Sequence, residues 1–300
     1  MKNIIIIVLV ALVAIVGIYA LSQRSTDTRE EPNEEEVTEN GNGEEVEEGE
    51  NANKMETVLG TSVEDRDIKA FHFGKGDNEI LFVGGISGGY SWNTSLVAYE
   101  LMDYLTENPE TIPATVKVTV IPTLNPDGLF KVTEKEGRFS SSDVNPSKSV
   151  QVAGRFNANE VDLNRNFDCN WQSEGVWQTR TVSGGTSAFS EPETKAIKAY
   201  IEKEKPDAVV AWYSAAGGVF ASQCNGGVLA ETQTLMNLYA DASGYKAYQE
   251  FGAYELTGDM TNWLAKIKIP AISILLTNHE DVEWAKNVKG IEALFDHYRS

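Results

Sequence analysis

Apolar runs alternate with segments of helical periodicity along most of the chain after residue 55. Residues 80–83 form a continuous apolar run of the kind found in a sheet that is covered on both faces. Strands are predicted at residues 80–83, 116–121, 208–212 and 271–276, and helices at residues 94–107, 191–203, 229–242 and 283–298. This order predicts an α/β fold, with a mixed, largely parallel central sheet and helices on both faces.

Ser190 is the predicted N-cap of the helix that follows it. Its hydroxyl is suited to accept a hydrogen bond from a free backbone N–H of the first turn, and Pro192 fits an early helical position. We therefore expect this helix to begin at residue 191.

The N-terminal region has a different pattern. Residues 4–22 carry no charge and are almost wholly apolar, long enough as a helix to cross the roughly 30 Å hydrocarbon core of a bilayer. A cleavable signal usually has a shorter apolar region of about 7 to 15 residues and a clear small-x-small site. We expect residues 1–24 to be a transmembrane anchor, with a signal sequence as the alternative. The basic residues on the two sides leave the orientation of the anchor open.

Residues 25–54 are dominated by Glu, Asn, Gly and Thr. Such a segment buries too little apolar surface to offset the entropy of ordering, so an acidic, disordered linker is predicted. We expect the globular domain at residues 55–300, outside the cytoplasm. Cys169 and Cys224 are the only cysteines, and both a disulfide and two buried thiols fit the sequence.

Composition excludes one class of partner. The chain has 300 residues, of which 41% are hydrophobic, enough for one large core. Its 25 Lys and Arg stand against 45 Asp and Glu, a formal net charge of −20. This field repels polyanions, so no nucleic acid is expected as a partner.

Three loops with turn-forming residues follow predicted strands, at residues 84–91, 123–128 and 213–218. Ligand sites of open α/β sheets gather where strands end, which makes these loops candidates. The first loop lacks the Lys-Ser/Thr ending of a phosphate-binding loop and the spacing Gly-x-Gly-x-x-Gly. A nucleotide site is therefore not expected.

Taken together, these segments resemble the zinc carboxypeptidase family over residues 55–300. The resemblance lies in the Gly-Gly-Ile loop, Asn125-Pro126-Asp127-Gly128, Arg155, the run Val161-Asp162-Leu163-Asn164-Arg165-Asn166-Phe167, Trp212-Tyr213-Ser214-Ala215, residues 257–263 and the last strand. The run that contains Asp-Leu-Asn-Arg-Asn-Phe is the most specific of these. The resemblance implies a zinc-carboxypeptidase-like fold.

The resemblance also implies a substrate-binding set. Asn164 and Arg165 would hold the C-terminal carboxylate of a peptide, Arg155 would polarise a carbonyl, and Tyr254 would close over the ligand. The planar fork of Arg suits a carboxylate, because it donates two parallel charge-assisted hydrogen bonds. The alternative is that Arg165 pairs with an internal carboxylate of this acidic chain.

The positions that bind zinc in the family hold other residues here: Ser87, Ser91 and Tyr213. Neutral hydroxyls are poor ligands for Zn²⁺, which selects imidazole, thiolate and carboxylate. The position of the family's catalytic Glu holds Leu275, which can neither accept nor deliver a proton. We therefore predict neither a metal ligand nor a catalytic residue in this chain.

The three histidines of the chain do not supply a substitute metal site. His72, His279 and His297 lie in no metal-binding spacing, although His279 has Glu280 and Asp281 beside it. Ser87 lacks the Gly-x-Ser-x-Gly setting of a serine hydrolase.

The resulting hypothesis is a membrane-tethered, non-catalytic domain that binds peptide C-termini or cell-wall peptides, with no cofactor. The alternative is an active metallocarboxypeptidase with a rearranged zinc site. A third hypothesis is a protein-interaction scaffold with a vestigial cleft. In that case Arg165 would have no role in binding.

Overall fold

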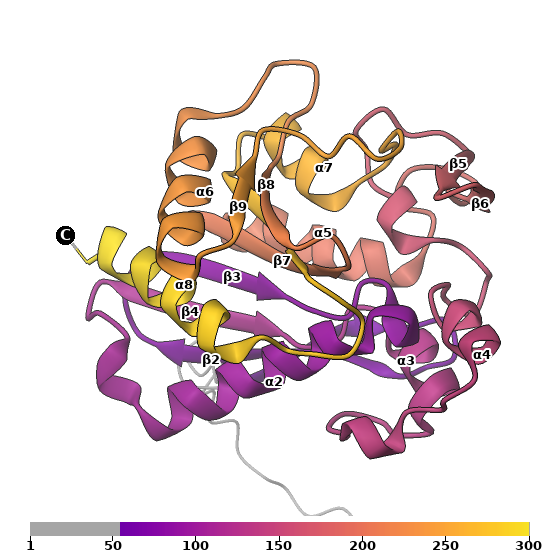
Figure 1. The fold of residues 1–300 in the computed structure, drawn as a ribbon, viewed down its shortest axis with the longest axis horizontal. Coiled ribbons are helices and arrows are strands. Elements are labelled where there is room, and N and C mark those ends of the chain that lie inside the picture. The colour runs from indigo at the N-terminus through magenta and orange to yellow at the C-terminus, as the bar shows by residue number, and fades with distance from the viewer. Residues whose placement is uncertain (1–54, 300) are drawn as a thin grey trace, which may run out of the picture. The chain divides into compact units, whose positions relative to one another are not determined.

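The computed structural model describes residues 55–299. In this part of the chain an eight-stranded mixed sheet forms the centre, with strand order β1-β2-β4-β3-β7-β10-β8-β9 (Figure 1). The neighbours β4, β3, β7 and β10 run parallel, as do β8 and β9, whereas β1-β2, β2-β4 and β8-β10 are antiparallel. The strands are β1 (Glu56–Thr61), β2 (Asp67–Gly74), β3 (Asn78–Val83), β4 (Val116–Ile121), β7 (Ala208–Ser214), β8 (Gly218–Ala221), β9 (Lys246–Tyr248) and β10 (Ala271–Leu276). The fold class is therefore the predicted one, an α/β fold with a mixed sheet.

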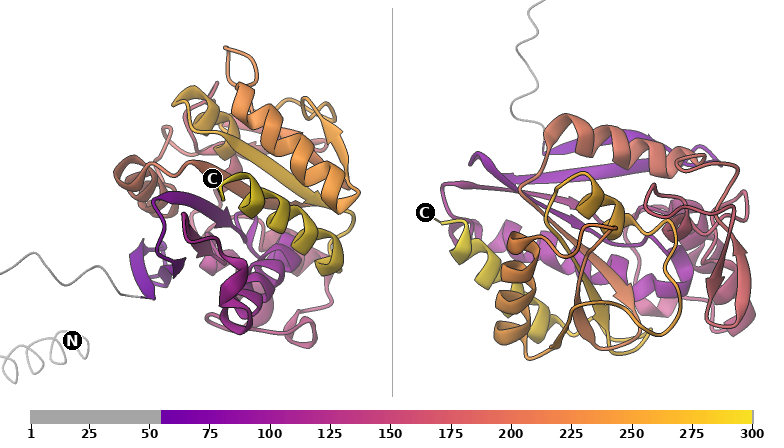
Figure 2. Two further views of the ribbon diagram at one scale, coloured as in Figure 1. Left: turned by 90° about the vertical axis from the view of Figure 1, so that its left-hand side faces the viewer. Right: turned by 90° about the horizontal axis from the view of Figure 1, so that it is seen from above.

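Helices cover both faces of the sheet (Figure 2). One face is covered by α2 (Trp92–Glu107), α6 (Ala230–Ser243) and α8 (Trp284–His297). The other is covered by α5 (Pro192–Glu204) and α7 (Met260–Lys266). The shorter helices are α3 (Pro126–Thr133) and α4 (Lys148–Ala153), and a separate antiparallel hairpin is formed by β5 (Glu174–Trp177) and β6 (Arg180–Ser183).

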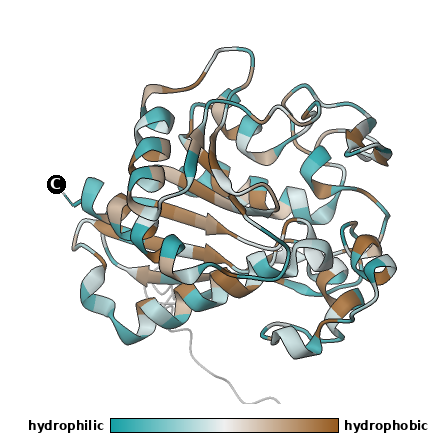
Figure 3. Cartoon of the chain, in the orientation of Figure 1, coloured by the Kyte–Doolittle hydropathy of each residue, from teal (hydrophilic) through white to brown (hydrophobic). Residues whose placement is uncertain are grey.

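Side chains of the central strands point alternately into two apolar cores. In β7, Trp212 packs with Phe82 and the α8 side of the sheet, whereas the next residue, Tyr213, belongs to the core under α5 and α7. Figure 3 shows the central strands as the most apolar part of the chain, with polar residues on the outer faces of the helices. Burying one large apolar side chain contributes about 1.5–3 kcal/mol, so two cores of this kind hold the sheet between the helix layers. The same alternation decides which residues at the strand ends face the ligand cleft described below.

The four predicted strands and the four predicted helices are all present, with boundaries that differ from the predicted ones by two residues at most. Helix α5 begins at Pro192 and its N-cap is Glu191, so the assignment of Ser190 as N-cap is wrong. The Ser190 hydroxyl instead donates to the Glu191 carboxylate at 2.6 Å. A local competing hydrogen bond of this kind is available to Ser outside a helix.

Residues 125–128, predicted as a turn, open a helix. The Asn125 side chain accepts a hydrogen bond from the backbone N–H of Gly128 at 2.9 Å and caps α3. Strands β1, β2, β5, β6, β8 and β9 were not predicted. In β1 the exposed and half-buried positions follow no alternation, because this edge strand has little contact with the core.

Cys169 and Cys224 form a disulfide, with their Cα atoms 6.0 Å apart and 55 residues between them in sequence. The alternative of two buried thiols is therefore wrong. The bridge ties the segment after Arg165 to the loop after β8.

The predicted membrane anchor at residues 1–24 and the predicted linker at residues 25–54 lie outside the described residues. Within residues 55–299, none of the helices combines the length and apolarity that crossing a bilayer requires.

Candidate ligand-binding cleft

A cavity of about 610 Å³ lies at the carboxyl ends of β3, β7 and β10. Its wall is formed by the loop after β3, the ends of β7 and β10, and the segment at residues 250–259 that leads into α7. This is the edge of an α/β sheet at which ligands commonly bind. Of the three candidate loops predicted from the sequence, residues 84–91 and 213–218 contribute to the wall, whereas none of residues 123–128 lines the cavity.

Three of the four positions at which the resemblance predicts zinc ligands or the catalytic carboxylate face this cavity. Ser87, Tyr213 and Leu275 line it, with Leu275 on the cleft side of β10 and Leu276 in the opposite core. Ser91 is only 2% exposed and does not line the cavity. The structure therefore brings together Ser87, Tyr213 and Leu275, and leaves Ser91 behind them.

The contacts of these residues do not suit a divalent cation. Ser87 Oγ accepts a hydrogen bond from Arg155 Nη1 at 3.2 Å, so a cationic group already faces this oxygen. The Tyr213 hydroxyl donates to Asn164 Oδ1 at 3.1 Å, and burial raises the pKa of Tyr213 well above its usual range. Among residues 55–299 there is no group of three or more His, Cys, Asp or Glu placed to hold a metal ion. The donor set does not fit zinc.

Arg155 lies in the cleft with its charge already compensated. Its Nε and Nη2 donate to Asp162 Oδ2 at 3.0 and 2.8 Å, and both side chains are buried. The guanidinium also lies over the Trp177 ring, 4.5 Å from its centroid. Asp162 therefore neutralises the Arg155 charge and occupies Nε and Nη2, and Nη1 is the nitrogen that faces the cleft.

Arg165 is buried without such a partner. It has no exposed surface, and its Nη1 and Nη2 donate to the backbone oxygens of Asn164 and Val176, each at 2.8 Å. Its Nε has no hydrogen-bond partner, and within residues 55–299 no carboxylate oxygen lies within 4.0 Å of it. The alternative considered for Arg165, an internal ion pair, is not formed in the described part of the chain.

Tyr254 separates Arg165 from the open cavity. The guanidinium carbon of Arg165 lies 5.6 Å from the centroid of the Tyr254 ring, and Tyr254 lines the cavity whereas Arg165 does not. Tyr254 belongs to a segment without helix or strand and packs against Phe251, with ring centroids 4.9 Å apart. A ligand would therefore reach Arg165 by displacing this ring.

The Asn164 side chain is oriented by Tyr213. Its Oδ1 accepts from the Tyr213 hydroxyl at 3.1 Å and, more weakly, from the backbone N–H of Met260 at 3.5 Å. Its Nδ2 makes no hydrogen bond with the described residues, and Asn164 lines the cavity. With its oxygen occupied, the amide can offer only N–H donors to a ligand.

Sequence reasoning gave no role in the cleft to His279 or Asp259, which both line it. The His279 ring packs on the Tyr90 ring at 4.4 Å, and burial, together with nearby Lys148 and Arg155, lowers the pKa of His279 to about 4. It is therefore neutral at pH 7. Glu280 and Asp281, its neighbours in sequence, do not line the cavity, so the trio is not assembled there.

The other two histidines lie away from the cleft. The ring nitrogens of His72, on β2, contact the hydroxyls of Thr57 and Thr119, each at 3.0 Å. His297 pairs with Glu231 at 2.7 Å. Neither contributes to the candidate site.

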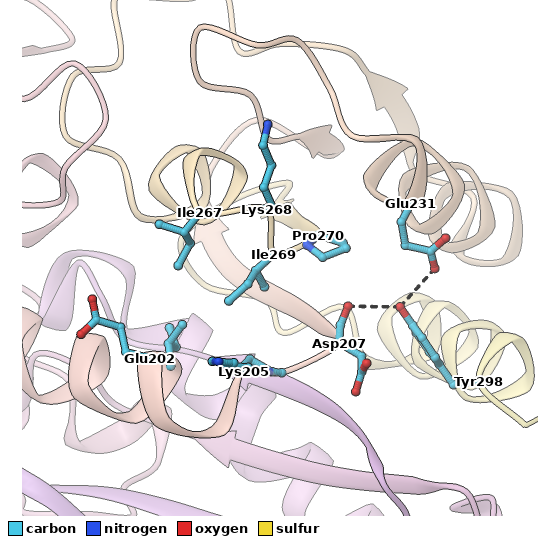
Figure 4. A pocket seen from close by; sticks show the side chains of 11 residues that line it. Glu202, Lys205, Asp207, Glu231, Ile267, Lys268, Ile269, Pro270 and Tyr298 are labelled. Carbon is cyan, nitrogen blue, oxygen red and sulfur yellow. Dashed lines mark hydrogen bonds between the residues drawn. The ribbon is translucent and has the colours of Figure 1, made fainter.

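A second cavity, of about 640 Å³, lies at the amino ends of β7 and β10 (Figure 4). Its apolar lining comes from Ile201, Ile267 and Ile269, and charged side chains also line it. The rim carboxylate of Glu231 accepts from the Tyr298 hydroxyl at 3.1 Å as well as pairing with His297. The motifs found in the sequence do not fall in this cavity.

Comparison with known proteins relates the fold and the cleft to one family. The zinc carboxypeptidase family model matches residues 47–282. Carboxypeptidase B of Helicoverpa zea is 27% identical over 156 residues, which are 49% of this chain and 34% of that protein. The catalytic chain of human carboxypeptidase N is 26% identical over 186 residues, 57% of this chain and 37% of that one. The chain thus spans about a third of the length of these curated relatives.

Solved structures share the fold at low sequence identity. Bovine thrombin-activatable fibrinolysis inhibitor, in complex with tick carboxypeptidase inhibitor, superposes with a TM-score of 0.62 and 17% identity, over 81% of this chain and 88% of that one. Murein-tripeptide amidase MpaA from Escherichia coli O157 superposes with a TM-score of 0.55 and 19% identity, over 83% and 93% of the two chains.

Proposed function

Because the chain belongs to the zinc carboxypeptidase family, we propose that it binds the free C-terminus of a peptide in the cleft and does not hydrolyse it. The proposed ligand is a peptide, or a cell-wall peptide, that ends in a free carboxylate. The observation that carries the proposal is the state of Arg165, a fully buried cation with no carboxylate partner in the described part of the chain.

A buried charge without a partner is unfavourable by several kcal/mol, and proteins usually compensate it with a counter-charge. The carboxylate of a ligand would supply that counter-charge to Arg165. It would also accept hydrogen bonds from the free N–H groups of the Asn164 amide. Tyr254, which covers Arg165, would then close over the bound end of the peptide. Arg155 would donate from Nη1 to a peptide carbonyl, since its other donors are held by Asp162.

The absence of catalysis follows from the chemistry of the side chains. Leu275 offers no lone pair or proton at the position of the family's general base, and Tyr213 keeps its proton because burial raises its pKa. Ser87 and Tyr213 already use their oxygens in hydrogen bonds with Arg155 and Asn164. These residues bind and orient, and none is suited to activate water.

The proposed location is a membrane-tethered domain outside the cytoplasm. The apolar stretch at residues 4–22 supports the tether. The Cys169–Cys224 disulfide supports an oxidising compartment, where such bonds persist. The structural likeness to a murein-tripeptide amidase supports a cell-wall peptide as the ligand class.

Binding is tested by calorimetry with the full chain and two forms of one peptide, the free acid and the C-terminal amide. We expect the free acid to bind about tenfold or more tightly, because only it carries the charge that Arg165 lacks. Arg165→Ala should remove this difference. Arg180→Ala is the matched control, because Arg180 is exposed on the hairpin and also lies over Trp177. Equal binding of acid and amide by the wild type would overturn the proposal.

Metal analysis tests the claim about catalysis. The purified full chain, with and without added Zn²⁺, should contain no stoichiometric zinc and should not cleave the peptides. About one zinc per chain with chelator-sensitive cleavage would instead support an active enzyme with a rearranged site. A variant that carries Ser87→His, Tyr213→His and Leu275→Glu, at three positions that line the cavity, is the positive control, and it should gain zinc.

A further inference from the structure

The Thr257 hydroxyl is buried and has no partner among residues 55–299. The side chain is 3% exposed, and its Oγ1 makes no hydrogen bond with the described residues. The Nε of Arg165 is in the same state. A buried polar atom without a partner is unfavourable, because it has lost its hydrogen bonds to water and gained none in return.

The two unpaired atoms lie against the same glycine of the β5–β6 hairpin. A Cβ atom at Gly175 would stand 3.0 Å from Thr257 Oγ1 and 3.1 Å from Arg165 Nε. Because residue 175 is a glycine, it places no side chain between the hydroxyl and the guanidinium. On the other side, a Cβ atom at Gly258 would stand only 2.1 Å from the backbone oxygen of Arg165. Residues 257–258 are therefore packed directly on Arg165.

The guanidinium of Arg165 is held by neutral acceptors. Its Nη1 and Nη2 donate to the backbone oxygens of Asn164 and Val176, each at 2.8 Å. A carboxylate is a stronger acceptor than a backbone carbonyl, since a charge-assisted hydrogen bond is roughly twice as strong as a neutral one. A ligand carboxylate can therefore compete with these two oxygens for the Nη groups.

We propose that Thr257 is a positioning residue of the carboxylate site. As a peptide carboxylate enters past Tyr254, the Arg165 guanidinium turns its Nη groups toward it, and the turn brings Nε–H to the Thr257 hydroxyl, which accepts a hydrogen bond from it. One new bond then gives both unpaired atoms a partner and fixes the orientation of the guanidinium on the ligand. This inference rests on the proposed function, because the carboxylate of the ligand is what turns the guanidinium.

The test compares Thr257→Val with the wild type, by calorimetry of the full chain with the free acid and the C-terminal amide of one peptide. Valine keeps nearly the shape of threonine and lacks the hydroxyl. The free acid should bind about tenfold more weakly to the variant, as expected for one lost hydrogen bond to a charged group, and the amide should bind as it does to the wild type. Thr257→Ser, which keeps a hydroxyl, should retain the affinity for the free acid.

Two further variants sharpen this test. Gly175→Ala adds a methyl group where Nε and the hydroxyl lie closest to the hairpin, and it should also weaken binding of the free acid. Thr232→Val is the matched control, because Thr232 is fully buried in α6 and its hydroxyl accepts from the backbone N–H of Ala271 at 3.2 Å. It should leave the binding of both peptide forms unchanged. Normal binding of the free acid by Thr257→Val or Gly175→Ala would overturn the inference.

Urea unfolding without peptide distinguishes a positioning role from a structural one. Thr257→Val removes an unpaired buried hydroxyl, so the midpoint of unfolding should stay the same or rise. Thr232→Val leaves the Ala271 N–H without this acceptor and should lower the midpoint. A lower midpoint for Thr257→Val, together with weaker binding of both peptide forms, would show a structural role only and would also overturn the inference.

The two peptide forms separate this inference from the proposed function. If amidation weakens binding to the wild type and to Thr257→Val alike, with unchanged affinities, the role of Thr257 is wrong and the proposed function stands. If the wild type binds the acid and the amide equally, the proposed function is overturned, and the inference with it.

Discussion

Two cavities of similar size, about 610 and 640 Å³, lie at the two ends of β7 and β10. Asp259 lines the cavity at the carboxyl ends, and Arg165 lies next to it behind Tyr254. Both side chains are buried, and neither forms an ion pair within the described residues. The cavity at the amino ends is surrounded by exposed lysines, Lys205 and Lys268, and its Glu231 is bonded to His297 and Tyr298.

The two cavities differ in whether their charged side chains are stabilised by solvent or by a partner. Solvent stabilises exposed charges such as Lys205 and Lys268, so the amino-end cavity needs no ligand. In the cleft, desolvated charges remain without partners, and a ligand gains most where it replaces a missing partner. Volume does not distinguish the two cavities, but the state of their charges does.

The largest expected difference concerns the ion pairs of the two cavities. Asp162→Asn should lower the free energy of unfolding by about 3–5 kcal/mol, because it leaves Arg155 buried and unpaired. Glu231→Gln should cost about 0–1 kcal/mol, because the pair with His297 is partly exposed. Urea unfolding of the full chain measures both, and equal costs would contradict the distinction drawn between the cavities.

The next prediction concerns the arginine that lacks a partner. Arg165→Lys keeps a positive charge but loses the planar fork, so a free-acid peptide should bind about tenfold more weakly. Lys268→Ala, at the rim of the second cavity, should leave binding unchanged. Calorimetry under the same conditions measures both variants, and a loss with Lys268→Ala would place the ligand at the wrong end of the sheet.

A pH-dependent difference is expected from His279. Its pKa in the folded chain, about 4, lies below the ordinary value of 6.5, so the folded state takes up this proton less readily. The contribution to stability is present above pH 6.5 and is lost as the pH falls through 4. We expect about 1 kcal/mol, allowing for partial exposure of the ring.

The measurement is urea unfolding between pH 4 and pH 7. His279→Asn should show a smaller fall in stability over this range than the wild type. Lys205→Met at the second cavity is the control, since lysine titrates far outside this range. Parallel curves for the wild type and His279→Asn would show that His279 does not contribute.

The smallest expected effect concerns the orientation of Asn164. Tyr213→Phe removes the hydroxyl that holds Asn164 Oδ1, and the free-acid peptide should bind about threefold more weakly, as expected for one neutral hydrogen bond. Tyr298→Phe removes a comparable hydroxyl from the second cavity and should have no effect on binding. If Tyr213→Phe binds normally while its fold is intact, Asn164 does not depend on Tyr213.

The pattern of apolar residues predicted the strands and helices well in the buried parts of the fold. The runs at residues 80–83 and 271–276 became central strands because both of their faces are covered. The edge strand β1 and the short strand β9 escaped prediction, since their side chains are mostly exposed and carry little periodic signal. The N-cap of α5 was missed because Ser190 has a competing side-chain partner in Glu191.

Of the candidate site, the sequence predicted Arg155, Asn164, Arg165 and Tyr254 in one cleft. The structure places Arg155, Asn164 and Tyr254 in the wall of the cavity, and Arg165 behind Tyr254. The partners of the two arginines were not predictable. Asp162 and many other carboxylates were available to either guanidinium, and only packing decides which lies within 3 Å of Arg155. His279 and Asp259 had no distinguishing pattern, because a lone His or an Asp before a helix occurs in many settings.

The sequence by itself determined which atoms stand at the positions predicted to correspond to the family's metal site. The hydroxyls of Ser87 and Tyr213 and the alkyl group of Leu275 are poor zinc ligands and proton acceptors in any conformation, because donor chemistry is a property of the side chain. The tertiary structure alone decided that Arg155 is paired, whereas Arg165 and Asp259 are buried and form no ion pair among residues 55–299. Burial and ion pairing depend on distances between residues far apart in the chain, and those distances exist only after the sheet and its loops have packed.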